Sequence, residues 1–259
     1  MSAPAVPPTA RHTVRQELLS RQLDEQIAAR FPVGQRLEVL GVGLGEGFQA
    51  LRLARAGHKV TGLEPDPAML DVARTVLSRE PEGIQERVRL IQGDGGETGV
   101  HFLPGTFDIV LCHGVLMDAP APDPDPLLAG LARMLAPGGL LSLVVRNADA
   151  PAMRPGLDGD WERALTAFES ADARYRLDAL TTTLAGIGAP LHTWYGVQVF
   201  TGHSEAGDPA SASGEGPVSA EGPVSGEGLE RLLAAEDRAA RTDPYRAVAE
   251  LLHLCGVRG

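Results

Sequence analysis

The chain has 259 residues, of which 43% are apolar, and a formal net charge of −11. This length and this apolar content are enough for a complete globular core. The negative charge is concentrated, because residues 204–230 contain six acidic residues and no basic one. A large uniform basic face is excluded, and this counts against non-specific nucleic-acid binding through phosphate neutralisation.

The two cysteines, Cys112 and Cys255, lie far apart in apolar runs and lack metal-ligand spacing. We expect them to be reduced core residues, and we expect no metal site. No stretch approaches the ~18 apolar residues of a membrane span, and the first residues lack the apolar core of a signal peptide. These features predict a cytoplasmic protein that does not enter the membrane.

The first two thirds of the chain alternate between helical and strand patterns. A disordered tail is predicted over residues 1–12, and apolar residues at helical spacing predict a helix over 13–30. Continuous apolar strands alternating with amphipathic helices predict an α/β fold, a doubly wound parallel sheet covered on both faces. The expected strands are 37–42, 58–64, 88–94, 107–114 and 140–146, and the expected helices are 46–56, 67–79 and 125–136.

After residue 147 the periodicity weakens. Helices are predicted over 161–168 and 178–187, followed by a strand over 192–200. Residues 204–228 are low in complexity and acidic, which is typical of a disordered linker, with an acidic docking element as the alternative. We therefore predict a core over 13–203, the linker over 204–228, and a segment over 229–259 whose helix and last strand (251–257) complete the same domain.

The glycine-rich stretch "LGVGLGEGFQ" follows the first predicted strand, where a doubly wound sheet binds its ligands. A phosphate loop is excluded, because no lysine follows the glycines. The dinucleotide pattern GxGxxG also fails, because the sixth residue counted from Gly41 is Glu46 and from Gly43 is Phe48.

The spacing that fits is GxGxG at Gly43, Gly45 and Gly47. Glu46 would repel a pyrophosphate at the following helix N-terminus but would tolerate a ligand with a positive centre. S-adenosylmethionine, an adenosine with a sulfonium and an amino-acid tail, is such a ligand. The alternative is that the glycines only make a tight turn.

Polar residues close the next three predicted strands. Glu64 is placed to accept hydrogen bonds from both ribose hydroxyls, and Asp94 to accept one from the adenine amino group. Gly95 and Gly96 would let the ring approach, although "GDGG" is equally natural as a turn. His113 is either a site residue or a structural histidine at a strand end.

Together these residues resemble the class I S-adenosylmethionine-dependent methyltransferases, and in particular the bacterial tRNA 5-carboxymethoxyuridine methyltransferases. "VLGVGLGEG" resembles that family's VLDAGGGEG, and "CHGVL" resembles FHAVLEW. "PGGLLSLVVRNA" is similar to PGGVLSLMFYNA, "GVQVF" to GVRVF, and "DPYRAVAELLHL" to EPYITLGRYIHV. The resemblance implies a seven-stranded Rossmann-like sheet with a C-terminal antiparallel hairpin and an N-terminal helix.

The resemblance also implies roles for residues of the cofactor site. Arg15 would bind the methionine carboxylate, Glu64 would bind the ribose, and His113 would close the site near the sulfonium. The methionine end would contact Gly43, Leu44 and Gly45, and the adenine would lie against Asp94, Gly95 and Gly96. The chain departs from the family at Gly41, which replaces an acidic residue.

The resemblance implies a carboxylate acceptor in modified tRNA, which is ionised at neutral pH and needs a cationic clamp rather than a base. Arg146, Arg154 and Arg176 are candidates for that clamp, or they are surface residues. A small-molecule O- or N-methyltransferase is the alternative, with His113 as general base. Asn147 would orient the acceptor, or cap a turn. A non-catalytic cofactor-binding module is the third possibility.

Overall fold

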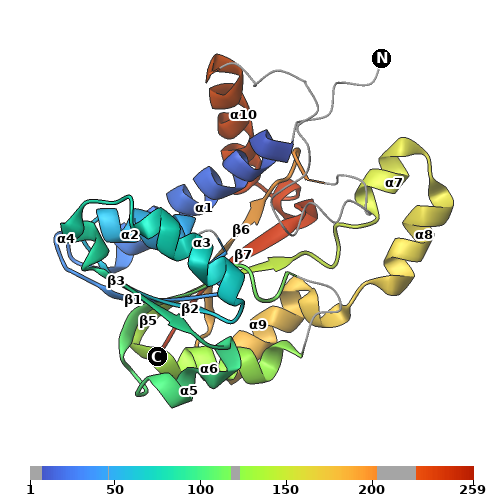
Figure 1. Ribbon diagram of the computed structural model, residues 1–259. Helices are drawn as coiled ribbons and strands as arrows, with labels where there is room; N and C mark the ends of the chain where they lie inside the picture. Colours follow the sequence, from blue (N-terminus) through green and yellow to red (C-terminus); the bar gives the residue numbers. More distant parts are fainter. Residues whose placement is uncertain (1–7, 46, 118–122, 203–225) are drawn as a thin grey trace. The chain divides into compact units, whose positions relative to one another are not determined.

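The computed structural model describes residues 8–45, 47–117, 123–202 and 226–259. Within these ranges, seven strands form one sheet in the order β3-β2-β1-β4-β5-β7-β6 (Figure 1). The strands are β1 (Glu38–Val42), β2 (Lys59–Glu64), β3 (Val88–Gln92), β4 (Phe107–Cys112), β5 (Leu135–Arg146), β6 (Leu191–Val197) and β7 (Leu251–Val257).

The strand directions confirm the predicted fold class. β1 pairs in parallel with β2 and β4, β2 with β3, and β4 with β5. The β5-β7-β6 edge is antiparallel, as the family resemblance implies. The strand order reverses between β1 and β4, and in such sheets ligands bind outside the carboxyl ends of the strands at this point.

Ten described α-helices connect or flank the strands. They are α1 (Pro8–Arg30), α2 (Phe48–Arg55), α3 (Pro67–Leu77), α4 (Glu82–Gln85), α5 (Thr98–His101), α6 (Pro124–Met134), α7 (Met153–Asp158), α8 (Trp161–Ser170), α9 (Leu177–Gly186) and α10 (Gly226–Ala239). Among the described residues, no helix combines the length and the apolar character that a transmembrane span requires.

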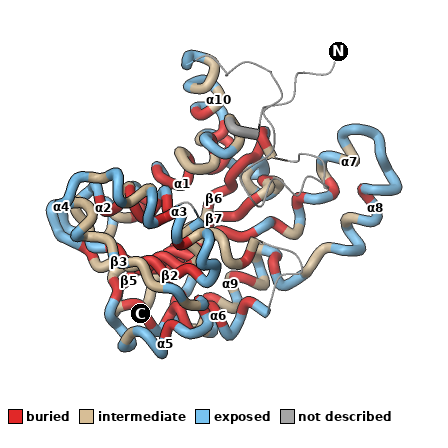
Figure 2. Tube along the Cα trace, viewed as in Figure 1, coloured by how far each residue is buried: buried red, intermediate tan, exposed pale blue. Residues whose placement is uncertain are grey.

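The chain divides into two compact units. Unit 1 comprises Met1–Gln22, Arg146–Arg176 and Tyr195–Leu252, and unit 2 comprises Leu23–Val145, Leu177–Trp194 and His253–Gly259. In unit 2, α2, α3 and α4 lie on one side of the sheet, and α5, α6 and α9 lie on the other (Figure 1). β1, β2, β4 and β5 are largely buried, β3 has no buried residue, and the outer helix faces are exposed (Figure 2).

Two helices of unit 2 begin with the same local device. Asp66 precedes Pro67 at the start of α3, and its side chain accepts a hydrogen bond from the Ala68 N–H at 2.8 Å. Asp123 precedes Pro124 at the start of α6 and bonds the Asp125 N–H in the same way. An aspartate cap satisfies an orphan N–H, and proline suits the first helical turn because its missing N–H would have no partner there.

In unit 1, a buried carboxylate fixes the segment that follows β6. Glu236 of α10 is fully buried, and its two oxygens accept hydrogen bonds from the backbone N–H groups of Val199, Phe200 and Thr201 at 2.7–3.0 Å. The Thr201 hydroxyl donates a fourth at 2.7 Å. We call this set the Glu236 network. It ties α10 to a segment in which Gln198 has a left-handed backbone (φ 60°).

Two predicted disordered segments each had one wrong boundary. The disordered tail was predicted over 1–12, but α1 begins at Pro8, because proline is tolerated in a first helical turn. The linker was predicted over 204–228, but α10 begins at Gly226. The rest of both segments, residues 1–7 and 203–225, lies outside the described residues.

The predicted start of the strand over 140–146 was also wrong, because β5 already begins at Leu135 and includes the "PGG" of residues 137–139. Its pairing with β4 shifts register, since Phe107 pairs with Leu135 but Ile109 pairs with Leu140. The glycines therefore form an irregularity inside the strand, with Gly138 at φ 75°, rather than a turn before it. Helix α7 was not predicted at all.

Candidate functional site

The loop between β1 and α2 carries three glycines with left-handed backbone. Gly43, Gly45 and Gly47 have φ values of 66°, 53° and 77°, which side chains rarely tolerate. A Cβ at Gly43 would meet the Val115 side chain at 2.6 Å, whereas a Cβ at Gly45 would meet no atom within 4 Å. The loop is therefore packed against the end of β4 at Gly43 and is open at Gly45.

Gly41 of β1 and Gly62 of β2 are register partners, and the Leu44 side chain lies against both. A Cβ at Gly62 would lie 2.3 Å from Leu44 and a Cβ at Gly41 would lie 3.1 Å from it, so the overlap is severe only at Gly62. The two glycines therefore form a flat platform for Leu44.

Glu64 lies at the carboxyl end of β2, directly beside the glycine loop. It is only 6% exposed, and its carboxylate accepts hydrogen bonds from the Gly45 N–H at 3.4 Å and the Asp66 N–H at 3.2 Å. Its own carbonyl accepts from the Gly93 N–H, which connects the ends of β2 and β3. Glu64 thus brings a carboxylate to the open part of the loop.

The turn after β3 packs closely against β1. Gly95 is buried, and a Cβ there would meet Val42 at 2.6 Å and Leu127 at 3.0 Å. Asp94 is exposed and accepts a hydrogen bond from the Gly96 N–H at 2.7 Å, so it caps the short 3-10 turn that follows. The turn reading of "GDGG" is therefore correct, and a contact of Asp94 with adenine stays a prediction.

His113 follows β4 and begins a chain of buried polar groups. Its Nε2 lies 2.7 Å from the Ser142 Oγ of β5, and the same Oγ lies 2.8 Å from Nε2 of His253 on β7. The two imidazole rings meet edge to face, with centroids 5.7 Å apart. Ser142 and His253 are fully buried, whereas His113 is half-buried. We call these three residues the histidine–serine relay.

The relay ends at the thiol of Cys255, whose Sγ lies 3.6 Å from Nε2 of His253. Burial lowers the pKa of His253 to about 3 and raises the pKa of Cys255 to about 12. Both groups are therefore uncharged at neutral pH. Cys112 and Cys255 are free and buried, as predicted.

The predicted residues of the cofactor end thus come together in unit 2. The carboxyl ends of β1 to β4 place the open backbone at Gly45, the carboxylate of Glu64, the turn at Gly95 and the ring of His113 along one edge of the sheet. Nothing in this set would neutralise a phosphate. The donors and acceptors suit a ligand with ribose hydroxyls and a positive centre.

The remaining predicted residues belong to unit 1, where Arg15 and Arg146 share one carboxylate. Arg146 lies 4.0 Å from Glu250 and is half exposed. Burial lowers the pKa of Arg15, the charge of Glu250 opposes this shift, and the charge of Arg146 adds to it. The binding of the methionine carboxylate by Arg15 stays a prediction from the resemblance.

Two other predicted acceptor residues have local partners in unit 1. Arg154 pairs with Asp158 at 2.6 Å within α7, and Arg176 pairs with Asp149 at 2.9 Å, all four being exposed. Ion pairs this exposed contribute little to stability. Their clamp role stays a prediction.

Asn147 is buried and caps a turn, which was the alternative interpretation of this residue. Its side-chain N–H groups donate to the Ala247 and Ala249 carbonyls at 2.9 and 2.8 Å, and its Oδ1 accepts from the Asp149 N–H at 3.0 Å. These bonds engage both amide hydrogens and the oxygen. A role for Asn147 in orienting the acceptor stays a prediction.

Sequence reasoning missed Ser142 and His253. Each is one polar residue inside an apolar strand, "LLSLVV" and "LLHLC", and this is the signal that a search for buried polar groups would have used. Their contact joins residues 111 positions apart, which the sequence does not reveal.

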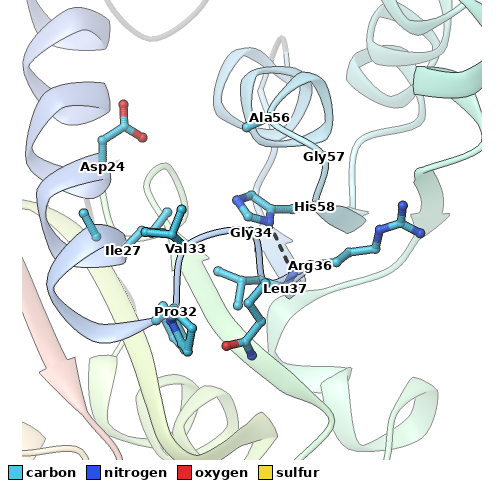
Figure 3. A pocket seen from close by; sticks show the side chains of 13 residues that line it. Asp24, Ile27, Pro32, Val33, Gly34, Arg36, Leu37, Ala56, Gly57 and His58 are labelled. Atoms are coloured by element: carbon cyan, nitrogen blue, oxygen red, sulfur yellow. Dashed lines mark hydrogen bonds between the residues drawn. The ribbon is translucent and has the colours of Figure 1, made fainter.

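A cavity of about 450 Å³ lies elsewhere in unit 2, near the amino ends of β1 and β2 (Figure 3). Its walls include Asp24, Val33, Arg36 and His58, and the His58 ring accepts a hydrogen bond from the Leu37 N–H at 3.2 Å. Burial, followed by the nearby Arg52, lowers the pKa of His58. None of the predicted site residues lines this cavity. In the described ranges, no cluster of three histidine, cysteine or acidic side chains could hold a metal ion.

Comparison with known proteins agrees with this geometry. Residues 40–143 match the sequence profile of a family described as "Methyltransferase domain", and this segment contains the glycine loop, Glu64, His113 and Ser142. The chain contains a methyltransferase domain. The match is consistent with the S-adenosylmethionine-dependent class that the resemblance implies.

Two curated relatives are methyltransferases. The tRNA 5-carboxymethoxyuridine methyltransferase of Escherichia coli is 32% identical over 154 residues, which are 60% of this chain and 56% of that protein. The ubiquinone biosynthesis O-methyltransferase of Xanthomonas axonopodis pv. citri is 32% identical over 144 residues, 56% of this chain and 54% of that protein. The chain spans about half the length of these relatives.

Among solved structures, the magnesium protoporphyrin IX methyltransferase of Synechocystis PCC 6803 has the same fold. It aligns with a TM-score of 0.57 and 15% identity over 97% of this chain and 86% of that chain. That protein was crystallised with S-adenosylhomocysteine (SAH) bound. At this identity the match supports the fold alone.

Proposed function

We propose that the chain transfers the methyl group of S-adenosylmethionine to a carboxylate oxygen. The observation that carries the cofactor half is the edge of unit 2, where Gly45 is open and the Glu64 carboxylate lies beside it. The cofactor supplies an activated methyl group on a sulfonium, which is already a good leaving group. The protein's own contribution is to bind and align the reactants, which is worth on the order of 7–11 kcal/mol.

We assign a role in cofactor binding to each residue of this edge of unit 2. Glu64 accepts the ribose hydroxyls, the Gly43–Gly45 backbone lies against the methionine end, and the Gly95 turn lies beside the adenine. The Glu64 oxygens already accept two backbone N–H groups, which fixes the direction of the carboxylate. A carboxylate held in this way loses little entropy when a ligand binds.

The carboxylate acceptor is supported by the similarity to the Escherichia coli relative, whose name states a 5-carboxymethoxyuridine in tRNA. In unit 1, Arg146 at the end of β5 lies 4.0 Å from Glu250 and is half exposed, and its guanidinium is the candidate clamp for the acceptor carboxylate. A carboxylate is ionised at neutral pH, so no general base is needed. The expected acceptor class is a carboxymethoxy-modified nucleoside in tRNA, by analogy with the Escherichia coli relative.

A hydroxyl acceptor is the second candidate, and the histidine–serine relay favours it. A hydroxyl must lose its proton as the methyl group arrives, and an oriented imidazole contributes typically 10²–10⁴-fold as general base. His113 is the histidine at the carboxyl end of β4 and is held through Nε2. The relative that is an O-methyltransferase of ubiquinone biosynthesis is consistent with this alternative.

One assay separates the two acceptors. The protein is incubated with methyl-labelled S-adenosylmethionine and total tRNA, and the labelled tRNA is then treated with mild base. Label that mild base removes indicates an ester on a carboxylate, and label that resists it indicates an ether or amine. No label in tRNA, with cofactor binding intact, would overturn the tRNA acceptor and move the proposal to a small molecule.

A matched pair of variants tests whether the glycine loop binds the cofactor. Gly45 and Gly34 both have positive φ, 53° and 83°, and a Cβ at either position meets no atom within 4 Å. Gly45→Ala and Gly34→Ala should therefore cost a similar stability, about 1 kcal/mol each. Only Gly45→Ala should weaken SAH binding, by roughly tenfold or more, because its methyl group obstructs the backbone. Equal affinities in the two variants would exclude the loop as the binding surface.

A further inference from the structure

Leu44 carries the only apolar side chain of the glycine loop between Gly43 and Gly47. Its tip lies over Gly62 in β2, where an added Cβ would lie 2.3 Å from the Leu44 Cδ1 and 3.0 Å from its Cδ2 and Cγ. Contacts below 3.0 Å essentially never occur between real Cβ atoms and their neighbours. The isobutyl group of Leu44 therefore fills the space that a side chain at position 62 would need.

The backbone conformation of Gly62 does not itself require glycine. Gly62 is not among the glycines with positive φ, and it pairs within the sheet with Gly41 of β1 and Leu90 of β3. Glycine inside a strand weakens the strand, and it often marks a place where another part of the chain approaches closely. Here the close approach is that of Leu44, so the glycine at position 62 serves the loop rather than the strand.

The loop above this contact lies directly beside Glu64. Gly62 and Glu64 are two residues apart in β2, so their side-chain positions point to the same face of the sheet. The Gly45 N–H donates to the Glu64 Oε2 at 3.4 Å, which is long for a hydrogen bond. Because Leu44 immediately precedes Gly45, the packing of its side chain on Gly62 sets the position of the amide that bonds Glu64.

The surroundings of Leu44 leave its side chain little freedom to move. Beside it is an apolar void of about 10 Å³, whose walls include residues of α2, α3 and β3 (Ala50, Leu51, Ala73, Leu77, Val88 and Leu90). A void of this size holds at most about one water molecule, so a displaced isobutyl group has no space to enter there. A side chain at position 62 would instead push Leu44, and with it the loop backbone, away from the sheet.

We propose that Gly62 is a positioning residue of the cofactor site. Because it lacks a side chain, Leu44 packs directly against the sheet and holds the Gly45 amide beside Glu64. Gly62 acts through Leu44 and the loop backbone and is assigned no contact with the cofactor. The inference rests on the proposed binding of S-adenosylmethionine at this loop and is independent of the acceptor.

Gly62→Ala and Gly41→Ala form a matched pair that tests the proposal. Both glycines lie in strands, neither has a positive φ, and a Cβ at Gly41 would meet Leu44 only at 3.1 Å. In calorimetric titration with SAH, the affinity should fall roughly tenfold or more in Gly62→Ala and less than about threefold in Gly41→Ala. Wild-type affinity in Gly62→Ala, or equal losses in the two variants, would overturn the proposal.

Leu44→Ala tests whether Gly62 acts through this side chain. The Cδ atoms are then gone, so adding Gly62→Ala in this background should change the affinity for SAH by less than about threefold. If Gly62→Ala weakens binding equally in both backgrounds, it acts by another route and the proposal is wrong. If Gly62→Ala alone fails to fold, the double variant should fold, and its failure beside a folded Leu44→Ala protein counts against the proposal in the same way.

Proton–nitrogen NMR of the nitrogen-15-labelled full chain separates this proposal from the proposed function. Without any ligand, the amide signals of Gly43 and Gly45 should shift in Gly62→Ala and stay close to their wild-type positions in Gly41→Ala. Unshifted loop signals in Gly62→Ala would contradict the positioning role. If the wild-type protein does not bind SAH, the proposed function fails, and these spectra still decide whether Gly62 sets the loop.

Discussion

The two units of the molecule each contain a buried polar network, and the two networks differ in where they end. The Glu236 network of unit 1 joins one carboxylate to three consecutive residues, 199–201, and three of its four named bonds are buried. The histidine–serine relay of unit 2 crosses three strands and reaches the half-buried ring of His113. The Glu236 network joins residues of unit 1 alone. The histidine–serine relay ends at the carboxyl ends of the strands of unit 2, where the candidate site lies.

This difference shows how a similar physical requirement serves two purposes. Any polar group removed from water must keep its hydrogen bonds, and both networks meet that requirement. The four bonds of Glu236 stabilise a chain segment with strained backbone at Gln198. The relay instead passes a constraint from the core to a residue at the candidate site. Removing each network should therefore affect different properties.

The largest effect on stability is expected from Glu236→Ala. It leaves two buried N–H groups, the part-buried N–H of Phe200 and a buried hydroxyl without their acceptor, and we expect the free energy of unfolding to fall by about 3–5 kcal/mol. Urea denaturation followed by circular dichroism measures this. Glu230→Ala, an exposed glutamate on the same helix α10, is the control and should change little. A loss below about 1 kcal/mol for Glu236→Ala would contradict its structural role.

The next effect concerns His253 and pH. Its pKa is about 3 in the folded protein and near 6.5 in the unfolded chain, so the unfolded state binds more protons between these values. The stability that depends on neutral His253 is complete above pH 6.5 and is lost as the pH falls toward 3, by up to about 1.4 kcal/mol per pH unit.

Replacing His253 by glutamine should flatten this dependence. Between pH 6.5 and pH 4, the wild-type free energy of unfolding should fall more steeply than that of His253→Gln. Carboxylates titrate in both proteins, so the difference between the two curves isolates the histidine. Parallel curves would show that His253 is not the buried neutral end of the relay.

The smallest effect is expected from Cys255→Ala. Loss of the sulfur leaves a small cavity and should cost about 1 kcal/mol. Urea denaturation measures this loss, and a loss above about 3 kcal/mol would contradict a role of Cys255 limited to packing.

Much of the fold could be predicted from sequence because its signals are local. The alternation of apolar strands and amphipathic helices gave the parallel sheet, and the strand over 251–257 was predicted with the observed bounds. The start of β5 was not predicted, because "PGG" is a local turn signal. In the structure these residues lie inside the strand, where the pairing with β4 is irregular. Tertiary pairing overrode a local preference there.

The candidate site divides in the same way. The glycine loop and Glu64 could be predicted because both are fixed by position relative to a strand end. Asn147 was left between two interpretations, and the structure fixes it as a turn cap through carbonyls 100 and 102 residues away. Ser142 and His253 also depend on contacts distant in sequence, which residue spacing does not encode.

The central claim is that the edge of unit 2 at Glu64 binds S-adenosylmethionine, and calorimetric titration with SAH tests it most directly. Wild-type protein should bind one equivalent. Glu64→Ala should bind roughly 10- to 100-fold more weakly, because hydrogen bonds to a charged group are lost from a buried position. Absence of binding to the wild-type protein, or equal affinity in the two proteins, would contradict the assignment of the site.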